Sequence, residues 1–165
     1  MMPRALFYLS LATTLGSGLI AGVFFAFSSF VMPALAKLPP AQGLAAMQSI
    51  NVVVLNRSFL SVFVGTAALA SLSTVLSLFG WSLPGSKLRI AGSVLYVVGT
   101  FLVTMACNVP LNEGIARLAP LSAEAAGVWS QYVPRWTAWN TVRALAALCA
   151  AAAWTLSLVQ SASAD

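Results

Sequence analysis

Two short clusters of polar and aromatic side chains interrupt the long apolar runs of this sequence, and they hold the residue types best suited to chemistry. Trp136, Asn140 and Arg143 follow i, i+4, i+7 spacing, which places them on one face of a helix. A guanidinium on such a face binds anions, and an amide beside it can add a hydrogen bond. The candidate residues are Asn108, Pro110, Asn112 and Glu113 in the first cluster and Trp136, Trp139, Asn140 and Arg143 in the second.

Arg143 is the most unusual residue of these clusters, because it lies about two turns inside an apolar run. A permanent cation within a membrane segment is expensive, and it usually faces the bundle interior and has a partner. Glu113 is the carboxylate that we expect to reach it, since it borders the preceding apolar run at the same membrane surface. Two interpretations remain open, and they are compatible with each other. In the first, Arg143 is structural and either snorkels toward the membrane surface or pairs with Glu113. In the second, Arg143 is placed for an anionic ligand.

Several kinds of chemistry are excluded by composition. The chain has no histidine, which is the usual ligand of haem, zinc, copper and non-haem iron centres. Three acidic residues cannot supply a di-metal carboxylate site, and no P-loop, dinucleotide-binding or nucleophile-elbow motif is present. The two cysteines, Cys107 and Cys149, form no CxxC pair. We therefore predict no metal site and no bound cofactor.

The elements that position these residues follow from hydropathy and charge. The chain is 60% hydrophobic and only 7% charged, which excludes an ordinary soluble domain. Its longest uncharged and mostly apolar runs each exceed the roughly 18 to 20 residues that cross a bilayer as a helix. We predict an all-α membrane protein, a single domain over residues 1–165, built as a bundle of four transmembrane helices. The spans are expected at about 5–30, 58–80, 88–108 and 136–160.

The connections between the spans differ in length. Trp81 and the pair Pro84-Gly85 predict a tight turn between spans two and three. Loops 31–57 and 109–135 are long and must share one membrane face, with both termini on the other. We expect short interfacial helices in both loops. In the first, Leu44, Met47 and Val54 form an apolar face and Gln48 and Asn51 are turned away from it.

Small and aromatic residues in span one have two interpretations each. Gly18 and Gly22 form a small-xxx-small pattern, which predicts a close contact with a neighbouring helix of the bundle; the alternative is a homo-oligomer interface. Phenylalanines at positions 24, 25, 27 and 30 spread around the helix. They either fill the core and face lipid, or Phe27 and its neighbours form an aromatic wall for a flat ligand.

The net charge of +5 and the distribution of the basic residues indicate which partners and which cellular location to expect. The eight basic residues are scattered singly rather than clustered on one face, which argues against nucleic-acid binding and favours contacts with lipid headgroups. We expect a multi-pass protein of the cell membrane, in bacteria the inner membrane. Arg4, Lys87 and Arg89 lie in short segments close to span ends, so we favour cytoplasmic termini.

Four stretches resemble the anthrone oxygenase-like family of small four-span membrane proteins, and together they cover nearly the whole chain. The most specific matches are the pattern N-x-P-L-N at residues 108–112 and the pattern W-x-x-W-N-x-x-R at residues 136–143. Many bacterial relatives have histidine directly after the asparagine of the second pattern, where this chain has Thr141. The four stretches are residues 22–33, 39–56, 101–113 and 129–147.

The resemblance implies a reaction that needs no metal. Fungal relatives oxidise a tricyclic anthrone with O₂ to an anthraquinone, and an anthrone enolate reacts with O₂ directly. The implied roles are Glu113 as general base, Arg143 with Asn140 or Asn112 as donors to the enolate oxygen, and Trp136, Trp139 and Phe27 as ring contacts, with Asn108 beside them. Two other classes stay open: a non-enzymatic binder or carrier of a lipophilic aromatic such as a quinone, and a structural or assembly subunit.

Overall fold

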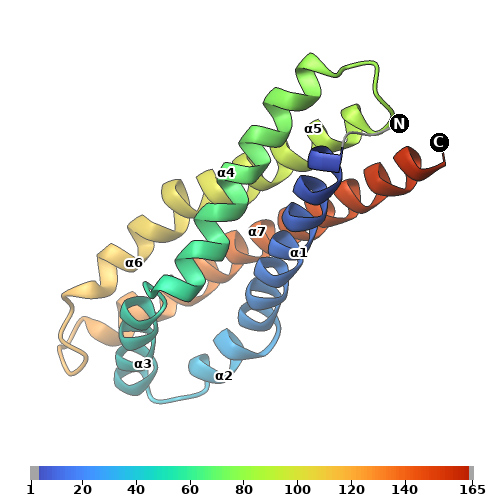
Figure 1. Cartoon of the computed structure of the whole chain (residues 1–165). Helices are drawn as coiled ribbons and strands as arrows, with labels where there is room; N and C mark the ends of the chain where they lie inside the picture. The colour runs from blue at the N-terminus through green and yellow to red at the C-terminus, as the bar shows by residue number, and fades with distance from the viewer. Residues whose placement is uncertain (1–3, 164–165) are drawn as a thin grey trace.

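A computed structural model describes residues 4–163, and these residues fold into helices without any strand. Figure 1 shows the long helices lying side by side as a bundle, with both ends of the chain at one end of it. The elements are α1 (Arg4–Ala26), η1 (Phe27–Val31), α2 (Met32–Ala36), α3 (Pro40–Val53), α4 (Arg57–Phe79), α5 (Ser86–Val94), η2 (Leu95–Leu102), η3 (Thr104–Asn108), α6 (Val109–Ala116) and α7 (Ala125–Ala162), where η marks a π-helical segment.

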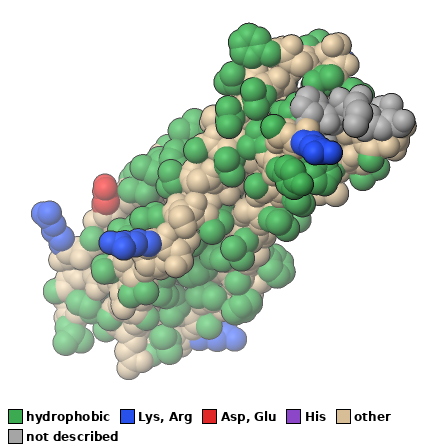
Figure 2. All heavy atoms as spheres, viewed as in Figure 1, with side chains coloured by type: hydrophobic (Ala, Val, Ile, Leu, Met, Phe, Trp, Pro, Cys, Tyr) green, Lys and Arg blue, Asp and Glu red, His purple; other side chains and the backbone are tan. Residues whose placement is uncertain are grey.

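Four continuous helices in residues 4–163 are long and apolar enough to cross a membrane, which confirms the predicted four-helix membrane bundle. They cover Arg4–Ala36, Arg57–Phe79, Ser86–Ala116 and Ala125–Ala162. Many large apolar side chains on their outer faces are exposed, as expected of surfaces that lie against lipid. Charged side chains on the face drawn in Figure 2 lie toward the two ends of the bundle. The chain is therefore a multi-pass membrane protein.

Three of these helices extend well beyond the predicted spans. Span four was expected to begin near residue 136, with residues 109–135 forming a loop. In the structure α7 begins at Ala125 and passes through Pro134 without ending. Trp129 and Tyr132 lie before the proline and are buried with Trp136 in one apolar cluster, so tertiary packing outweighs the lost hydrogen bond.

The long loops are consequently shorter than the sequence indicated. Residues 109–116 continue span three as α6, and only residues 117–124 remain between α6 and α7. In the first loop the expected helix is confirmed as α3, which buries Leu44 and Met47. The prediction that Gln48 turns away is wrong. Its Nε2 donates to the carbonyl oxygens of Ile115 and Leu118 at 2.7 and 2.9 Å, because the end of α6 leaves carbonyls without helical partners.

Close packing of small residues joins spans three and four. A Cβ atom added at Gly92 would lie 3.1 Å from the carbonyl oxygen of Ala150, and one added at Gly99 would lie 2.6 Å from Cβ of Ala146. The alanine-rich part of α7 therefore forms a close-packing surface for span three.

Gly18 and Gly22 do not take part in such a contact. An added Cβ atom at either position meets no atom within 4 Å, so the predicted bundle contact at this pair is wrong. The buried face of α1 is instead formed by residues such as Ser17, Ile20 and Phe24. Ser17 shows the consequence, because its hydroxyl donates to the carbonyl oxygen of Ala147 on α7 at 2.7 Å. A homo-oligomer interface at the glycine pair stays a prediction.

The tight turn predicted from Pro84-Gly85 is present between spans two and three, and Gly85 has a left-handed backbone with φ of 79°. Arg89 was expected to contact lipid headgroups, but it is fully buried. Its guanidinium donates to the hydroxyls of Ser77 and Ser86 and to the carbonyl oxygen of Pro84. Arg89 therefore links α5 to the turn and to the end of α4, where polar partners offset the burial of its charge.

Candidate functional site

The π-helical segments and the polar cluster occur at the same level of the bundle. Ser28 belongs to η1, and Thr104 and Asn108 belong to η3. All three contact α7 through hydrogen bonds to the residues that the sequence selected as candidates. Isolated π-helical turns are uncommon in α-helices and are frequent at functional sites, because the wider turn redirects side chains. Their coincidence with the polar cluster marks this level as the candidate site.

Arg143 forms the centre of the cluster and is only 4% exposed. Its Nη1 donates to the hydroxyl of Thr104 at 3.1 Å, and its Nη2 donates to Oδ1 of Asn140 at 2.7 Å. The guanidinium carbon lies 4.1 Å from the ring centroid of Phe24 and 5.3 Å from that of Trp136. Aromatic faces and neutral oxygens thus surround this cation inside the membrane bundle.

Asn140 is held from the opposite side by span one. Its Nδ2 donates to the carbonyl oxygen of Phe24 at 2.6 Å and to the hydroxyl of Ser28 at 2.7 Å. Both amide hydrogens are therefore used, and Oδ1 is the atom left to face Arg143. In this arrangement Asn140 orients Arg143 and ties α7 to the η1 segment.

Asn112 organises the aromatic residues next to Arg143. Its Oδ1 accepts hydrogen bonds from the hydroxyl of Tyr132 at 2.9 Å and from Nε1 of Trp136 at 2.8 Å. Phe27 packs on Trp136, with ring centroids 5.6 Å apart, and Trp129 stacks on Tyr132 at 5.7 Å. One amide oxygen therefore fixes two buried aromatic side chains in a single row along α7.

Three buried polar atoms at this level have no hydrogen-bond partner among residues 4–163. They are Nε of Arg143, Oδ1 of Asn108 and Oγ1 of Thr137. Asn108 uses its other amide atom, Nδ2, to donate to the carbonyl oxygen of Trp136 at 3.2 Å. An unused donor and an unused acceptor in a buried site are costly, and they are common where a protein binds a polar ligand.

Glu113 does not pair with Arg143, and the predicted ion pair is wrong. The two side chains form no salt bridge among the described residues, and Glu113 is exposed. The reason is helical geometry. Asn112 points inward to Tyr132 and Trp136, and the following residue is turned by about 100° to the outer side of α6.

The other candidates are placed as follows. Trp136, Asn140 and Arg143 share one buried face, which confirms the spacing argument. Trp139 lies at the edge of this face, is 42% exposed, and does not join the cluster. The sequence analysis did not select Tyr132, although it precedes Trp136 by four residues, because residues 109–135 were predicted to be a loop.

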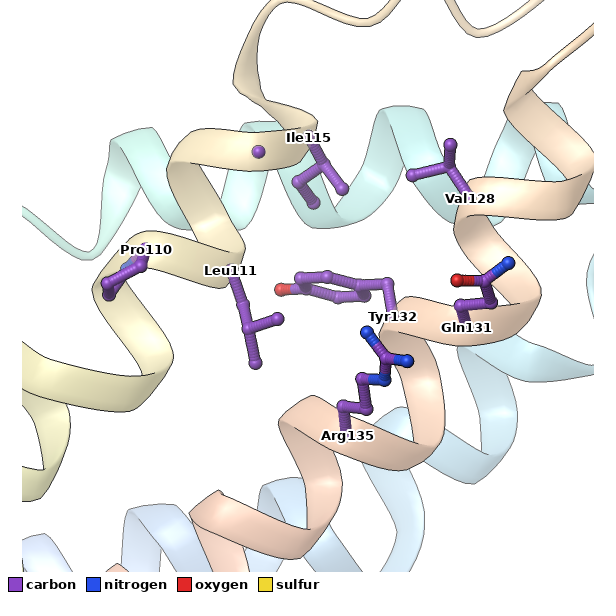
Figure 3. A pocket seen from close by; sticks show the side chains of 8 residues that line it. Pro110, Leu111, Ile115, Val128, Gln131, Tyr132 and Arg135 are labelled. Carbon is purple, nitrogen blue, oxygen red and sulfur yellow. The ribbon is translucent and has the colours of Figure 1, made fainter.

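A small pocket opens beside this row of aromatics, between the last part of span three and the start of α7 (Figure 3). Its volume is about 180 Å³, and it is partly open to the surface. Tyr132 lines it and, through Asn112, connects it to Trp136 and Arg143. Its walls include Leu111, Gly114 and Ile115 on one side and Gln131, Tyr132 and Arg135 on the other.

The side chains of residues 4–163 bring together no group of three or more His, Cys, Asp or Glu that could hold a metal ion. The donors of the candidate site are instead neutral amides, hydroxyls and one guanidinium. This set suits an organic anion or a polarised carbonyl, which accept hydrogen bonds, better than a cation.

Comparison with known proteins adds one finding. No curated protein and no solved structure matches the chain. The profile of the anthrone oxygenase family matches residues 53–153, a region that contains Asn108, Asn112, Trp136, Asn140 and Arg143. Since this match covers more than half of the sequence, the chain belongs to the anthrone oxygenase family.

Proposed function

We propose that the protein is a membrane-embedded oxidoreductase that uses O₂ to oxidise an anthrone or a similar polycyclic phenol or quinol, without a metal or an organic cofactor. The observation that carries this proposal is the environment of Arg143. A buried guanidinium held by Thr104, Asn140 and two aromatic rings, with no carboxylate paired to it in the described residues, is prepared for an anion. The enolate of an anthrone is such an anion.

The chemistry requires loss of a proton from the CH₂ group between the rings, which leaves a negative charge on the carbonyl oxygen. Arg143 stabilises this oxygen by hydrogen bonding and by charge, and Asn140 acts as a positioning residue that holds the guanidinium. The electron-rich carbon then bonds to O₂. One oxygen atom becomes the new carbonyl and the other leaves as water, so anthrone and O₂ give anthraquinone and one water molecule.

The proton acceptor is proposed to be Glu113, which directly precedes Gly114 on the pocket wall. Its side chain is exposed, so this role requires it to turn toward the pocket. Trp136 and Phe27 supply ring contacts beside Arg143, and Asn108 offers a free acceptor to a substrate hydroxyl. Part of a tricyclic substrate would lie in the open mouth, because about 180 Å³ is below the roughly 300 Å³ of typical ligand pockets.

A second candidate function is supported by the position of Glu113. A carrier of a lipophilic quinone would use Arg143 and the aromatic row but would need no base, and the outward orientation of Glu113 agrees with that. For either function we propose a location in the bacterial inner membrane with both termini in the cytoplasm.

The test of the enzymatic function is oxygen-dependent production of anthraquinone. Membranes containing the protein are compared with empty membranes under air and under argon, with several anthrones, and spontaneous oxidation is subtracted. We expect faster product formation only with protein and air, together with uptake of one O₂ per anthrone. Equal rates in both membranes would refute the enzyme, and saturable binding of an anthraquinone by the same membranes would then support the carrier.

A further inference from the structure

The pocket between α6 and α7 combines an apolar interior with two polar side chains at one wall (Figure 3). Gln131 and Arg135 are four residues apart on α7, so they lie side by side on one helix face. Leu111 and Ile115 face them from α6. An occupant of this pocket therefore meets hydrogen-bond donors on one side and hydrocarbon on the other.

Arg135 brings a positive charge that the described part of the chain does not neutralise. The acidic residues within residues 4–163 are Glu113 and Glu124, and neither forms a salt bridge with Arg135. A guanidinium presents a planar pair of donors, which matches the two oxygens of a carboxylate. The charge and the shape of this group favour a carboxylate over a neutral polar group.

The size and the walls of the pocket indicate what the carboxylate is attached to. A volume of about 180 Å³ accommodates one or two fused rings but does not enclose a two-chain lipid. Tyr132 is kept rigid by its stack on Trp129 and its hydrogen bond to Asn112, so it offers a fixed aromatic surface. Flat rings pack well against such a surface.

We propose that this pocket binds an aromatic acid, with its carboxylate paired to Arg135 and its ring held between Tyr132 and the apolar wall of α6. This binding does not require the oxidation step at Arg143, so the site exists whether the protein is an enzyme or a carrier. The hydrogen bonds from Tyr132 and Trp136 to Asn112 connect the pocket to the surroundings of Arg143.

Gly114 offers a direct way to close the pocket. It lines the cavity, and a Cβ atom added to it meets no atom within 4 Å, so a larger side chain can enter the pocket without displacing the backbone. Gly127 on α7 is a matched control, because it is equally open but does not line the pocket. Arg117 is a matched control for charge, since it is an exposed arginine outside the pocket.

The test uses 2-naphthoate, whose own fluorescence reports binding, and its neutral counterpart 2-naphthamide. The protein is placed in phosphatidylcholine nanodiscs, and empty nanodiscs give the background. We expect saturable binding of naphthoate that is at least about tenfold tighter than that of naphthamide. Arg135→Gln should abolish the preference for naphthoate over naphthamide, and Gly114→Leu should weaken naphthoate binding by about tenfold or more. The control variants Arg117→Gln and Gly127→Leu should change neither the preference nor the affinity.

Several results would overturn the proposal. Absence of saturable naphthoate binding to the wild-type protein is one, and equal affinity for the acid and the amide is another. A third result would show that the anion bound in the pocket comes from a lipid headgroup. If replacing phosphatidylcholine with phosphatidylglycerol abolishes naphthoate binding to the wild-type protein, an anionic lipid headgroup occupies the pocket and the aromatic-acid proposal is wrong. These binding measurements do not involve anthrone oxidation, so a protein that does not oxidise anthrones could still give the expected binding results.

Discussion

Arg143 and Asn140 are joined by a hydrogen bond of 2.7 Å between Nη2 of the guanidinium and Oδ1 of the amide, one turn apart on α7. Asn140 is itself fixed to span one through Phe24 and Ser28. The orientation of the cation in span four is therefore set by a contact between spans one and four. This relationship, rather than an ion pair, explains how a charged side chain is held inside the bundle.

The first prediction concerns this contact. Asn140→Ala should lower the free energy of unfolding by about 1–3 kcal/mol, because it leaves buried donors of Arg143 and acceptors of span one without partners. Arg143→Ala should also lower the free energy of unfolding, and the double variant should lose clearly less stability than the sum of the losses in the two single variants. Unfolding in mixed micelles titrated with SDS measures these values.

Glu113 provides the control for that cycle. Since it is exposed and forms no ion pair with Arg143, Glu113→Ala should change stability by no more than about 0.5 kcal/mol, and its effect should add to that of Arg143→Ala. A coupling energy above about 1 kcal/mol between Glu113 and Arg143 would contradict the site geometry described here.

A second prediction follows from the two hydrogen bonds accepted by Asn112. Asn112→Ala leaves the Tyr132 hydroxyl and the Trp136 indole N–H without their partner, so it should destabilise by about 2–4 kcal/mol. Tyr132→Phe removes only one of these donors and should cost about 1 kcal/mol. Ser130→Ala is the control, because that hydroxyl is exposed. If Asn112→Ala behaved like the control, the row of aromatics would not depend on it.

The comparison of sequence and structure shows what local pattern can and cannot predict. The spacing of Trp136, Asn140 and Arg143 predicted a shared face because helical periodicity is independent of tertiary context. The sequence did not predict which residues hold Arg143, because its opposite charge selected Glu113, whereas the structure uses Thr104 and Asn140. Glu113 is excluded by the direction in which α6 faces, since Asn112 points inward to Tyr132 and Trp136 and the next residue therefore points outward.

The start of α7 also could not be predicted from local sequence, because it depends on tertiary packing. Span four was predicted to begin near residue 136, yet α7 begins at Ala125 and continues through Pro134, because buried aromatic side chains on both sides of the proline compensate for the hydrogen bond that it removes. The π-helical segments had no sequence signal at all. They occur in spans one and three, where both pack against α7, and a local sequence pattern does not contain this tertiary packing.

The third prediction distinguishes glycines that pack from glycines that face lipid. Gly99→Ala places a methyl group against Ala146, where neither side chain can move aside, and should destabilise by about 1–3 kcal/mol. Gly22→Ala should be neutral or stabilise slightly, because its surroundings are open and alanine favours the helix. Comparable losses in both variants would indicate that Gly22 packs against another chain.

The fourth prediction concerns topology. Single cysteines at Ser82 and Ala123, in a background without Cys107 and Cys149, should be labelled from opposite sides of the membrane. Both positions are exposed and lie at opposite ends of the bundle, whereas Ser86 in the same turn as Ser82 is buried and unsuitable. With cytoplasmic termini, an impermeant maleimide added to spheroplasts should label position 123 and spare position 82. Labelling of both from one side would refute the four-span arrangement.

The most direct measurement of the central claim is the rate of O₂-dependent anthrone oxidation by Arg143→Lys compared with the wild type at equal protein content. Lysine keeps the charge but lacks the planar fork that binds Asn140 and an enolate oxygen together. We therefore predict that the oxidation rate falls by about 100-fold or more. Trp139→Phe, on the exposed side of α7, should keep the wild-type rate. A wild-type rate in a folded Arg143→Lys protein would contradict the proposed role of Arg143.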